Sequence, residues 1–453
     1  PNSYTAHNNA PVDIQSTSQS TSDAIHVKRA YGVITALNEQ LELRFGRMAD
    51  HWGLGVLNNS GDCIDCDYGD VVDRVSATFR LADHLFSPMY TWRSSGPTMM
   101  TLGTSQAQAL DAYTWDDVED YSVRILKIDH PEDIHDQVSQ GETVFNYGLM
   151  NSLRQQAYGI DQKFYYDSNN NPSSDEQRQT DILNQTSLKE SRDGFIYTGD
   201  AFLKLYSGNV ELALEAAIIY GNFKDTATSA QPDAEDTSSE LAPQETTLYQ
   251  VGGAIELTYK FSGENKGASL HIQTGGASGD SAPGFGALTS ADGQRAAPSK
   301  SFGGDTTLDN FQFNPDYHVD MILFRQMIGT VTDAWYVKPE VAYEFDNKLT
   351  GSLAAIYSQA LFKRSTASCF DPTSTTGYTC DGDEKKGALP LGIEFDAELA
   401  YNTEKTPAGG SFGGSFGGGI LFPLAGFDNL ALPTDDQAGS FAWTLQAKLH
   451  LTF

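Results

Sequence analysis

Apolar and polar residues alternate with a period of two at the C-terminal end of the chain. The odd positions from 441 to 453 hold Phe, Trp, Leu, Ala, Leu, Leu and Phe, and the even positions between them include Thr, Gln, Lys and His. One face is therefore apolar over roughly ten residues, the length that a tilted strand needs to cross a membrane with lipid outside and water inside. The alternation predicts a transmembrane β-strand that ends on an aromatic residue, Phe453.

The same alternation recurs earlier in the chain. It is clearest in residues 74–81, 210–218, 251–261, 335–345 and 391–401. Aromatic residues often stand near the ends of these segments, as the interfacial girdles of a membrane barrel require. No run of apolar residues in the sequence approaches the roughly 18 that a membrane-spanning helix needs. The chain is therefore predicted to be all-β, an antiparallel transmembrane β-barrel.

Short and long connections alternate between the predicted strands. Short turns are expected at residues 37–40, 207–209, 262–266, 346–348 and 406–409, and long polar connections at 49–70, 94–118, 161–192, 223–246, 277–332, 363–388 and 425–439. In bacterial barrels the short turns are periplasmic and the long loops extracellular. The count is about fifteen strands, and the first and the last run in the same direction. Because closed barrels normally have an even number, we expect about 16, or alternatively 18, strands when complete, with one or more missing upstream.

Three segments carry further structural expectations. Residues 24–453 should form the barrel, whereas residues 1–23, rich in Ser, Thr, Gln and Asn, should be the tail of an extracellular loop or a disordered segment. A weak first strand over residues 12–18 is the alternative. Residue one is Pro1 and no signal peptide follows, which predicts a processed or truncated chain. Residues 319–328 are apolar with one Arg, and we favour a segment folded into the barrel as a constriction over an additional strand.

Composition and charge narrow the functional classes. The chain has 29 Lys and Arg against 60 Asp and Glu, a net charge of −31. Nucleic acid is excluded as an expected partner because phosphate binding needs basic residues in excess. Much of the acid falls in predicted loops, where a solvated surface is favoured over a dedicated cation site.

The polar face of each predicted strand should line the lumen. On this basis the pore-lining charges are basic in the early strands and mainly acidic in the later ones: Lys28, Arg44, Arg74, Arg80 and Arg124, then Glu211, Glu215, Glu256, Glu340, Glu344, Glu394, Asp396 and Glu398. Opposed basic and acidic walls would create a transverse field that orients polar solutes. The alternative is that these charges neutralise neighbours across adjacent strands. With acid in excess, a channel of this kind should prefer cations or zwitterions.

The four cysteines form two local pairs in polar loops, Cys63–Cys66 and Cys369–Cys380. Disulfides in an oxidising compartment are favoured, with zinc at the first pair and free thiols as alternatives. The loop around the first pair also contains four closely spaced carboxylates, Asp62, Asp65, Asp67 and Asp70. Acid-rich, Gly-containing loops suit Ca²⁺, although aspartates also serve to form hydrogen-bonded turns, and the turn interpretation is favoured. No cofactor is required by the predicted function.

Enzymatic functions are not expected. The histidines are scattered and none stands in a motif with an activated nucleophile. The Gly-rich run at residues 409–419 lacks the Lys-Ser/Thr of a phosphate-binding loop. Small residues in a closely packed strand or bend explain this run better.

Several motifs carry a family resemblance. Arg29-Ala30-Tyr31-Gly32 and, after a short turn, Leu43-Arg44-Phe45-Gly46-Arg47 resemble the strand–turn–strand of many Gram-negative porins. A narrower similarity, to a poorly characterised outer-membrane protein family of myxobacteria and related bacteria, rests on the segments that begin at Met48, Asp67, Asn314 and Tyr336. The resemblance implies a barrel in the bacterial outer membrane with extra strands upstream. It says little about the solute.

Two functions from different classes follow. The first is a porin-like channel for passive diffusion of small polar solutes, with outer-membrane lipid as its surroundings. The second is a non-conducting structural or partner-binding barrel in an envelope complex. The sequence leaves open whether the chain forms a homo-oligomer or has a partner in the envelope. An open lumen would support the first function and a plugged lumen the second.

Overall fold

The computed structural model describes residues 28–66, 68–93, 117–160, 189–225, 244–261, 267–280, 307–345, 348–363, 365–369, 387–403, 411–428 and 440–452. Its strands are β1 (Ala30–Ala36), β2 (Leu41–Ala49), β3 (Val71–Leu81), β4 (His84–Arg93), β5 (Val118–Lys127), β6 (Thr143–Ile160), β7 (Lys189–Ser207), β8 (Val210–Asp225), β9 (Gln244–Lys260), β10 (Gly267–Ala277), β11 (Thr307–Leu308), β12 (Ala334–Glu344), β13 (Leu349–Ala360), β14 (Pro390–Asn402), β15 (Ser411–Pro423) and β16 (Ala442–Thr452). Its helices are α2 (Pro131–Ser139), the π-helical turn η7 (Leu323–Ile328), and the 3₁₀ turns η8 (Ala367–Cys369) and η9 (Ala425–Phe427).

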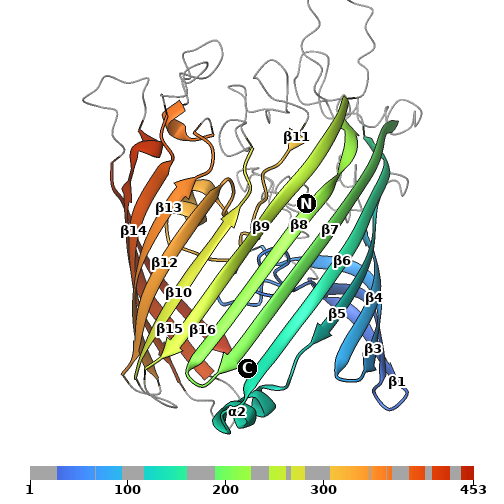
Figure 1. The fold of residues 1–453 in the computed structure, drawn as a ribbon, viewed down its shortest axis with the longest axis horizontal. Helices are drawn as coiled ribbons and strands as arrows, with labels where there is room; N and C mark the ends of the chain where they lie inside the picture. The colour runs from blue at the N-terminus through green and yellow to red at the C-terminus, as the bar shows by residue number, and fades with distance from the viewer. Residues whose placement is uncertain are drawn as a thin grey trace, which may run out of the picture.

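All sixteen strands belong to one sheet. Every strand except β11 pairs antiparallel with its neighbours in chain order, and the two-residue β11 lies parallel to β9 beside that path. Figure 1 shows the tilted strands wrapping into a barrel. Within the described residues, no pairing joins β1 to β16. The predicted all-β antiparallel barrel is confirmed, and the count of about fifteen agrees because β11 adds only two residues.

The two faces of each strand follow the predicted alternation. On β16 the side chains of Trp443, Leu445 and Leu449 are 65%, 63% and 79% exposed on the outside of the sheet. Thr444 lies on the other face and pairs with Gly419 of β15. Exposed large apolar side chains on the outer face of a barrel are what a lipid environment requires. The register derived from the sequence is therefore correct for this strand.

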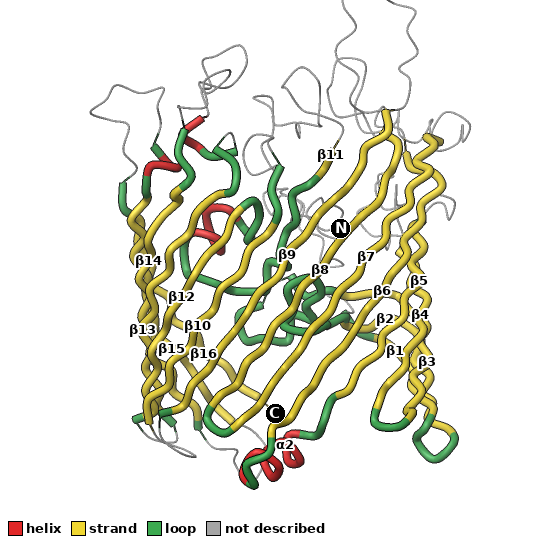
Figure 2. Tube along the Cα trace, viewed as in Figure 1, coloured by secondary structure: helices red, strands yellow, loops and turns green. Residues whose placement is uncertain are grey.

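The described short turns at residues 37–40, 82–83 and 208–209 lie at one end of the barrel (Figure 2). Two features of the short end were not predicted. Ala82 and Asp83 form a two-residue turn in which both residues have positive φ, 45° and 62°, the geometry that joins twisted antiparallel strands tightly. Helix α2 fills the connection between β5 and β6, with Pro131 in its first turn and the His130 side chain accepting a hydrogen bond from the Glu132 N–H.

Two of the long connections turn into the barrel, where Figure 2 shows them as loops crossing the interior. We call residues 50–70 the first inward loop and residues 310–333 the second inward loop. The second contains η7 and no strand, so the predicted inward-folded segment at residues 319–328 is confirmed over the alternative of an additional strand. In the described part of the chain, no helix is long and apolar enough to cross a membrane.

Candidate functional site

The first inward loop is anchored at its start by a buried ion cluster. Asp50 is 1% exposed, and its two carboxylate oxygens accept from Arg74 of β3 at 2.8 and 3.0 Å. Arg124 of β5 donates to the same carboxylate at 2.7 Å. Burial alone would raise the pKa of Asp50, but Arg124 and Arg74 together hold it well below its usual range. Asp50 is thus an anion at neutral pH that joins the loop to two strands.

A second wall residue holds the middle of this loop through its backbone. Glu215 of β8 is 1% exposed and accepts N–H groups from four consecutive residues, 54–57, including Gly55 at 3.1 Å and Leu57 at 3.3 Å. Gly53 and Gly55 have φ of +57° and +85°. These left-handed positions turn successive N–H groups toward one point, which makes an anion-binding concavity that a side chain with Cβ would disfavour.

An aromatic contact completes the attachment of the first loop. The Trp52 indole N–H donates to Asp200 of β7 at 3.1 Å, and its ring meets Phe202 edge-on at 5.0 Å between centroids. The Arg124 guanidinium lies 5.1 Å from the Trp52 ring centroid. A cation above an indole adds attraction to the ion cluster. The loop is therefore held by charge, backbone hydrogen bonds and one aromatic anchor.

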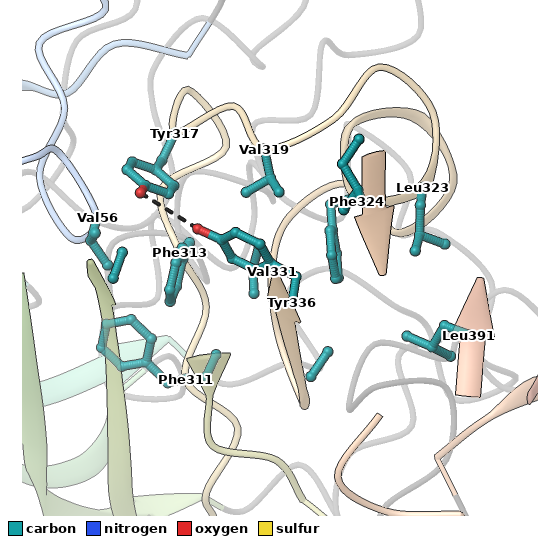
Figure 3. Close-up of a cluster of buried hydrophobic side chains, with 14 of the residues drawn as sticks. Val56, Phe311, Phe313, Tyr317, Val319, Leu323, Phe324, Val331, Tyr336 and Leu391 are labelled. Atoms are coloured by element: carbon teal, nitrogen blue, oxygen red, sulfur yellow. Dashed lines mark hydrogen bonds between the residues drawn. The ribbon is translucent and has the colours of Figure 1, made fainter. Parts of the chain in front are cut away.

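The second inward loop brings its own apolar core into the barrel (Figure 3). It contributes Phe311, Phe313, Tyr317, Val319, Leu323, Phe324 and Val331, which pack with Val56 of the first loop and with wall residues that include Tyr336 and Leu391. Phe311 and Phe313 contact edge-on at 6.0 Å between centroids, as do Phe313 and Tyr317 at 5.4 Å. A packed core inside a barrel of this kind fixes the loop in place.

Glu394 of β14 binds the second loop as Glu215 binds the first. It is 1% exposed and accepts the N–H groups of Met321, Ile322 and Leu323 at 3.0, 2.8 and 3.0 Å. Asp320 caps the following turn by accepting from Phe324 at 3.0 Å. Burial and the charge of Glu394 raise the pKa of Asp320 to about 7, against the lowering effect of these N–H groups.

The Gly-rich strand β15 makes room for this attachment. A Cβ on Gly417 would lie 2.9 Å from Met321 Cε, and one on Gly419 would lie 3.2 Å from Met321 Cβ. Both contacts are closer than ordinary van der Waals distance, so the absent side chains let Met321 rest on the strand. This agrees with the expectation that small residues in a closely packed strand explain the run at residues 409–419.

The two inward loops are also bound to each other. The Asn314 N–H donates to Val56 O at 2.7 Å, and the Tyr68 N–H donates to the Asp316 carboxylate at 3.0 Å. Asp65 of the first loop pairs with Arg325 of the second at 2.9 Å and with Lys448 of β16 at 2.6 Å. Burial would raise the pKa of Asp65, but hydrogen bonds from Lys448 and Arg325 lower it to about 2. The loops form one body that reaches across the lumen.

Strand register shows where the predicted pore-lining residues lie. Twelve of the thirteen predicted charges share the face of the sheet that the inward loops contact: Arg44, Arg74, Arg80, Arg124, Glu211, Glu215, Glu256, Glu340, Glu344, Glu394, Asp396 and Glu398. Lys28 precedes β1 and is exposed. Whether solutes pass along these residues stays a prediction.

The inward charges have several kinds of partner. Arg154 pairs with Asp120 across adjacent strands at 3.3 Å, as the neighbour-neutralising alternative expects. Arg74 and Arg124 instead pair with Asp50 of the first loop, and the Tyr317 hydroxyl of the second loop donates to Glu256 at 2.8 Å. The inward loops therefore engage charges on both the basic and the acidic wall.

The candidate calcium ligands have protein partners in this structure. Asp62 pairs with Arg29, Asp65 with Arg325 and Lys448, and Asp70 accepts from Asn59 N–H at 3.0 Å and from Asn314 Nδ2 at 2.8 Å. Asp67 lies outside the described residues. Calcium binding by this loop stays a prediction, and an ion there would compete with these contacts.

The first predicted disulfide is present. Cys63 and Cys66 are joined, with Cα atoms 5.1 Å apart, so the local pairing is confirmed and the zinc alternative for these two residues is not supported. Cys369 is buried and disulfide-bonded, and Cys380 lies outside the described residues. The disulfide at residues 63–66 stiffens the first loop beside Asp65.

Three features of the site were missed by sequence reasoning. Asp50 was not chosen because a single acid at the start of an acidic loop carries no distinguishing pattern. The backbone-binding roles of Glu215 and Glu394 could not be seen because their partners are more than 70 residues away. The Gly53-Leu54-Gly55 spacing beside Trp52 was the one available signal, since alternate glycines favour an anion-binding backbone turn.

Comparisons with known proteins give distant likenesses to outer-membrane barrels. OccK11 (OpdR) of Pseudomonas aeruginosa matches with a TM-score of 0.39 and 10% identity, over 91% of this chain and 76% of that one. A variant of OccD1 (OprD) matches with a TM-score of 0.38 and 8% identity, over 91% and 74%. OmpF of Salmonella typhi, in complex with daunomycin, matches with a TM-score of 0.27 and 11% identity, over 92% and 100%. No family model and no curated protein matches the chain.

Proposed function

We propose that this chain forms a porin-like channel in a bacterial outer membrane for passive diffusion of small polar solutes. The observation that carries the proposal is the division of the barrel into an apolar outer face and a charged inner face. Exposed Leu445, Leu449 and Trp443 suit lipid, whereas Arg80, Glu344 and other charges lie on the inner face. A charged inner face needs water, and a water-filled barrel conducts small solutes.

The inward loops would set the size of what passes. They are bound to β3, β5, β8, β14 and β16 through Asp50, Glu215, Glu394 and Asp65, so they narrow the barrel across its width. Solutes would have to pass beside these loops. We therefore expect a small conductance and a low size limit rather than the wide bore of an unobstructed barrel of this strand number.

A preference for cations is the finer part of the proposal. The acids Glu211, Glu340, Glu344 and Glu398 lie on the inner face of β8, β12 and β14. Fixed carboxylates along a low-dielectric passage concentrate cations. Purified protein in a planar bilayer tests this through the reversal potential in a salt gradient. Cation selectivity is expected, and an anion-selective reversal potential would refute this part alone.

A non-conducting structural barrel is the second candidate, and one observation favours it. The second inward loop carries a packed apolar core with fully buried Phe311, Phe313 and Leu323, which is more typical of a fixed plug than of a flexible gate. The same bilayer experiment separates the two. Absence of current from protein that is folded, as shown by heat-modifiable migration, would favour the structural role.

A further inference from the structure

In each inward loop, one wall glutamate accepts consecutive backbone N–H groups. Glu215 takes those of residues 54–57 and Glu394 those of residues 321–323. We call each glutamate with its N–H donors a latch. The two latches lie on different strands, β8 and β14, and hold loops that are far apart in the sequence. The repeated arrangement suggests a shared physical role.

Each latch glutamate lies against a second buried acid. Asp200 of β7 interacts with Glu215, and Asp396 interacts with Glu394 from two residues along β14. Asp200 and Asp396 are only 4% and 8% exposed. One oxygen of each, Asp200 Oδ2 and Asp396 Oδ1, is buried without a hydrogen-bond partner. Asp396 Oδ1 and Glu394 Oε1 both lie close to the position that a Cβ atom on Gly419 would occupy.

The charged groups around each pair do not neutralise it. Arg124 faces Asp200, but its guanidinium is bonded to Asp50 at 2.7 Å. Around the second pair, Lys338 of β12 faces Asp396 and is also paired with Glu340 at 3.3 Å. Asp320 of the second loop adds a third acid there. Gly419 of β15 contributes no side chain. Each pair therefore carries more acid than its neighbouring cations offset.

Two adjacent carboxyl groups in a buried place cannot both ionise at low energy, so such a pair retains one proton. The N–H donors of each latch stabilise negative charge on the glutamate. One proton is therefore shared by the two carboxyl groups of each pair, where it can bridge the glutamate and the otherwise unpartnered aspartate oxygen.

We propose that the pairs Asp200–Glu215 and Asp396–Glu394 are proton-binding sites, and that loss of their protons as pH rises releases the inward loops from the wall. The latched state binds more protons than the released state, so raising the pH shifts the balance toward release. At alkaline pH both members of a pair are charged, and the repulsion is relieved when the loop leaves and water enters. Asp320 acts in the same direction, because burial and the charge of Glu394 raise its pKa to about 7. Its ionisation as pH rises adds negative charge beside the Asp396–Glu394 pair.

The effect of the latches on current rests on the proposed channel. The opening of the latches themselves can be measured without any current. Amide hydrogen exchange of the full chain in lipid nanodiscs, at about pH 5 and about pH 8, reports the N–H groups of residues 321–323 and 54–57 directly. After correction for intrinsic exchange, we expect their protection to fall by about tenfold or more at the higher pH, the effect of one unit of pKa difference. The Leu257 amide of β9 should not change.

The aspartate variants test the cause. Asp396→Asn and Asp200→Asn keep the shape of a protonated aspartate and cannot ionise, so each should retain protection of its own loop at about pH 8. Glu344→Gln, an exposed acid on the same inner face, is the matched control and should keep the wild-type response. Wild-type protection that does not depend on pH, or the same loss in both aspartate variants, would overturn the proposal.

Two further measurements complete the test. The first needs no variant and so does not depend on variants that fold, and the second separates the latch proposal from the channel proposal. Infrared spectra of the wild-type protein at neutral pH should contain a band of buried protonated carboxyl groups that disappears on alkalinisation, and its absence would also overturn the proposal. Current through a bilayer should increase with pH in the wild type and not in the double variant. A pH-dependent change in hydrogen exchange without any current would refute the proposed channel but not the proposed latches.

Discussion

The two inward loops occupy the same lumen but are held there by different physical means. The first loop depends on charge, through Asp50 with Arg74 and Arg124, and contributes one fully buried apolar side chain, Val56, to the central core. The second depends on the burial of apolar surface, because it buries Phe311, Phe313, Leu323 and several other apolar side chains. Both share the backbone latch. Ionic attachment therefore gives the first loop a defined position that one charge change can destroy, whereas apolar packing spreads the stability of the second over many contacts.

Removing the anion at the base of the first loop should have the largest effect. Asp50→Ala removes the carboxylate that pairs with the buried Arg74 and Arg124, and we expect a loss of about 3–5 kcal/mol in the free energy of unfolding. Denaturant unfolding from lipid vesicles measures it. Asp73→Ala is the matched control, because its partner Arg47 is half exposed, and should lose about 1 kcal/mol or less. Similar losses in both variants would show that burial of the ion cluster does not matter.

A cavity in the second loop should have a comparable or somewhat smaller effect that does not depend on salt. Leu323→Ala removes a side chain that is 1% exposed, and such changes destabilise by about 2–5 kcal/mol. Met327→Ala in the same π-helical turn, where the side chain is 48% exposed, should change stability by about 1 kcal/mol or less. The comparison between the loops fails if the Leu323 variant is rescued by salt, since apolar packing is not screened.

The next prediction sharpens the contrast between the inner face, which holds the loops, and the outer face, which holds lipid. Leu445→Arg on β16 places a charge against hydrocarbon and should destabilise by about 2–4 kcal/mol if it lies at the midplane. Thr444→Arg should be much milder, because Thr444 lies on the inner face. Unfolding from vesicles ranks the two variants. The reverse ranking would contradict the register of the strand.

The smallest effect is expected where the two loops meet β16. Asp65 pairs with Arg325 and Lys448, and their side chains are 24%, 18% and 25% exposed. Lys448→Gln should therefore lower stability by about 1 kcal/mol or less, and salt should reduce the difference.

The pH dependence of this contact has a defined sign. The pKa of Asp65 is lowered to about 2, so its contribution is fully present above its ordinary value and is lost as pH falls from about 4 to about 2. Thermal unfolding across this range should show a smaller acid loss in the Lys448→Gln variant than in the wild type. An identical acid loss in both would assign it to other carboxyls.

Much of the fold could be predicted because the two faces of a membrane barrel require different residue types at alternating positions of each strand. Lipid on one side and water on the other force apolar and polar side chains to alternate, as Leu445 and Thr444 do. The two-residue turn at Ala82–Asp83 and helix α2 were missed, since neither carries the Gly, Asn or strong periodicity on which such predictions rest. The inward segment around Leu323 was recognised because a long apolar run in a polar connection has to be buried somewhere.

The sequence by itself determined which side chains face lipid, which face the lumen, where the long connections lie and which segment folds inward. These properties depend on local periodicity, on connection length and on the cost of exposing apolar surface. Only the tertiary structure decided that Asp50 reaches Arg74 and Arg124, that Glu215 and Glu394 bind loop backbones, and that Met321 rests on the Gly-rich β15. Each of these contacts joins residues that are distant in the chain, and an acid in a strand has the same sequence signature whether it lines a passage or holds a loop.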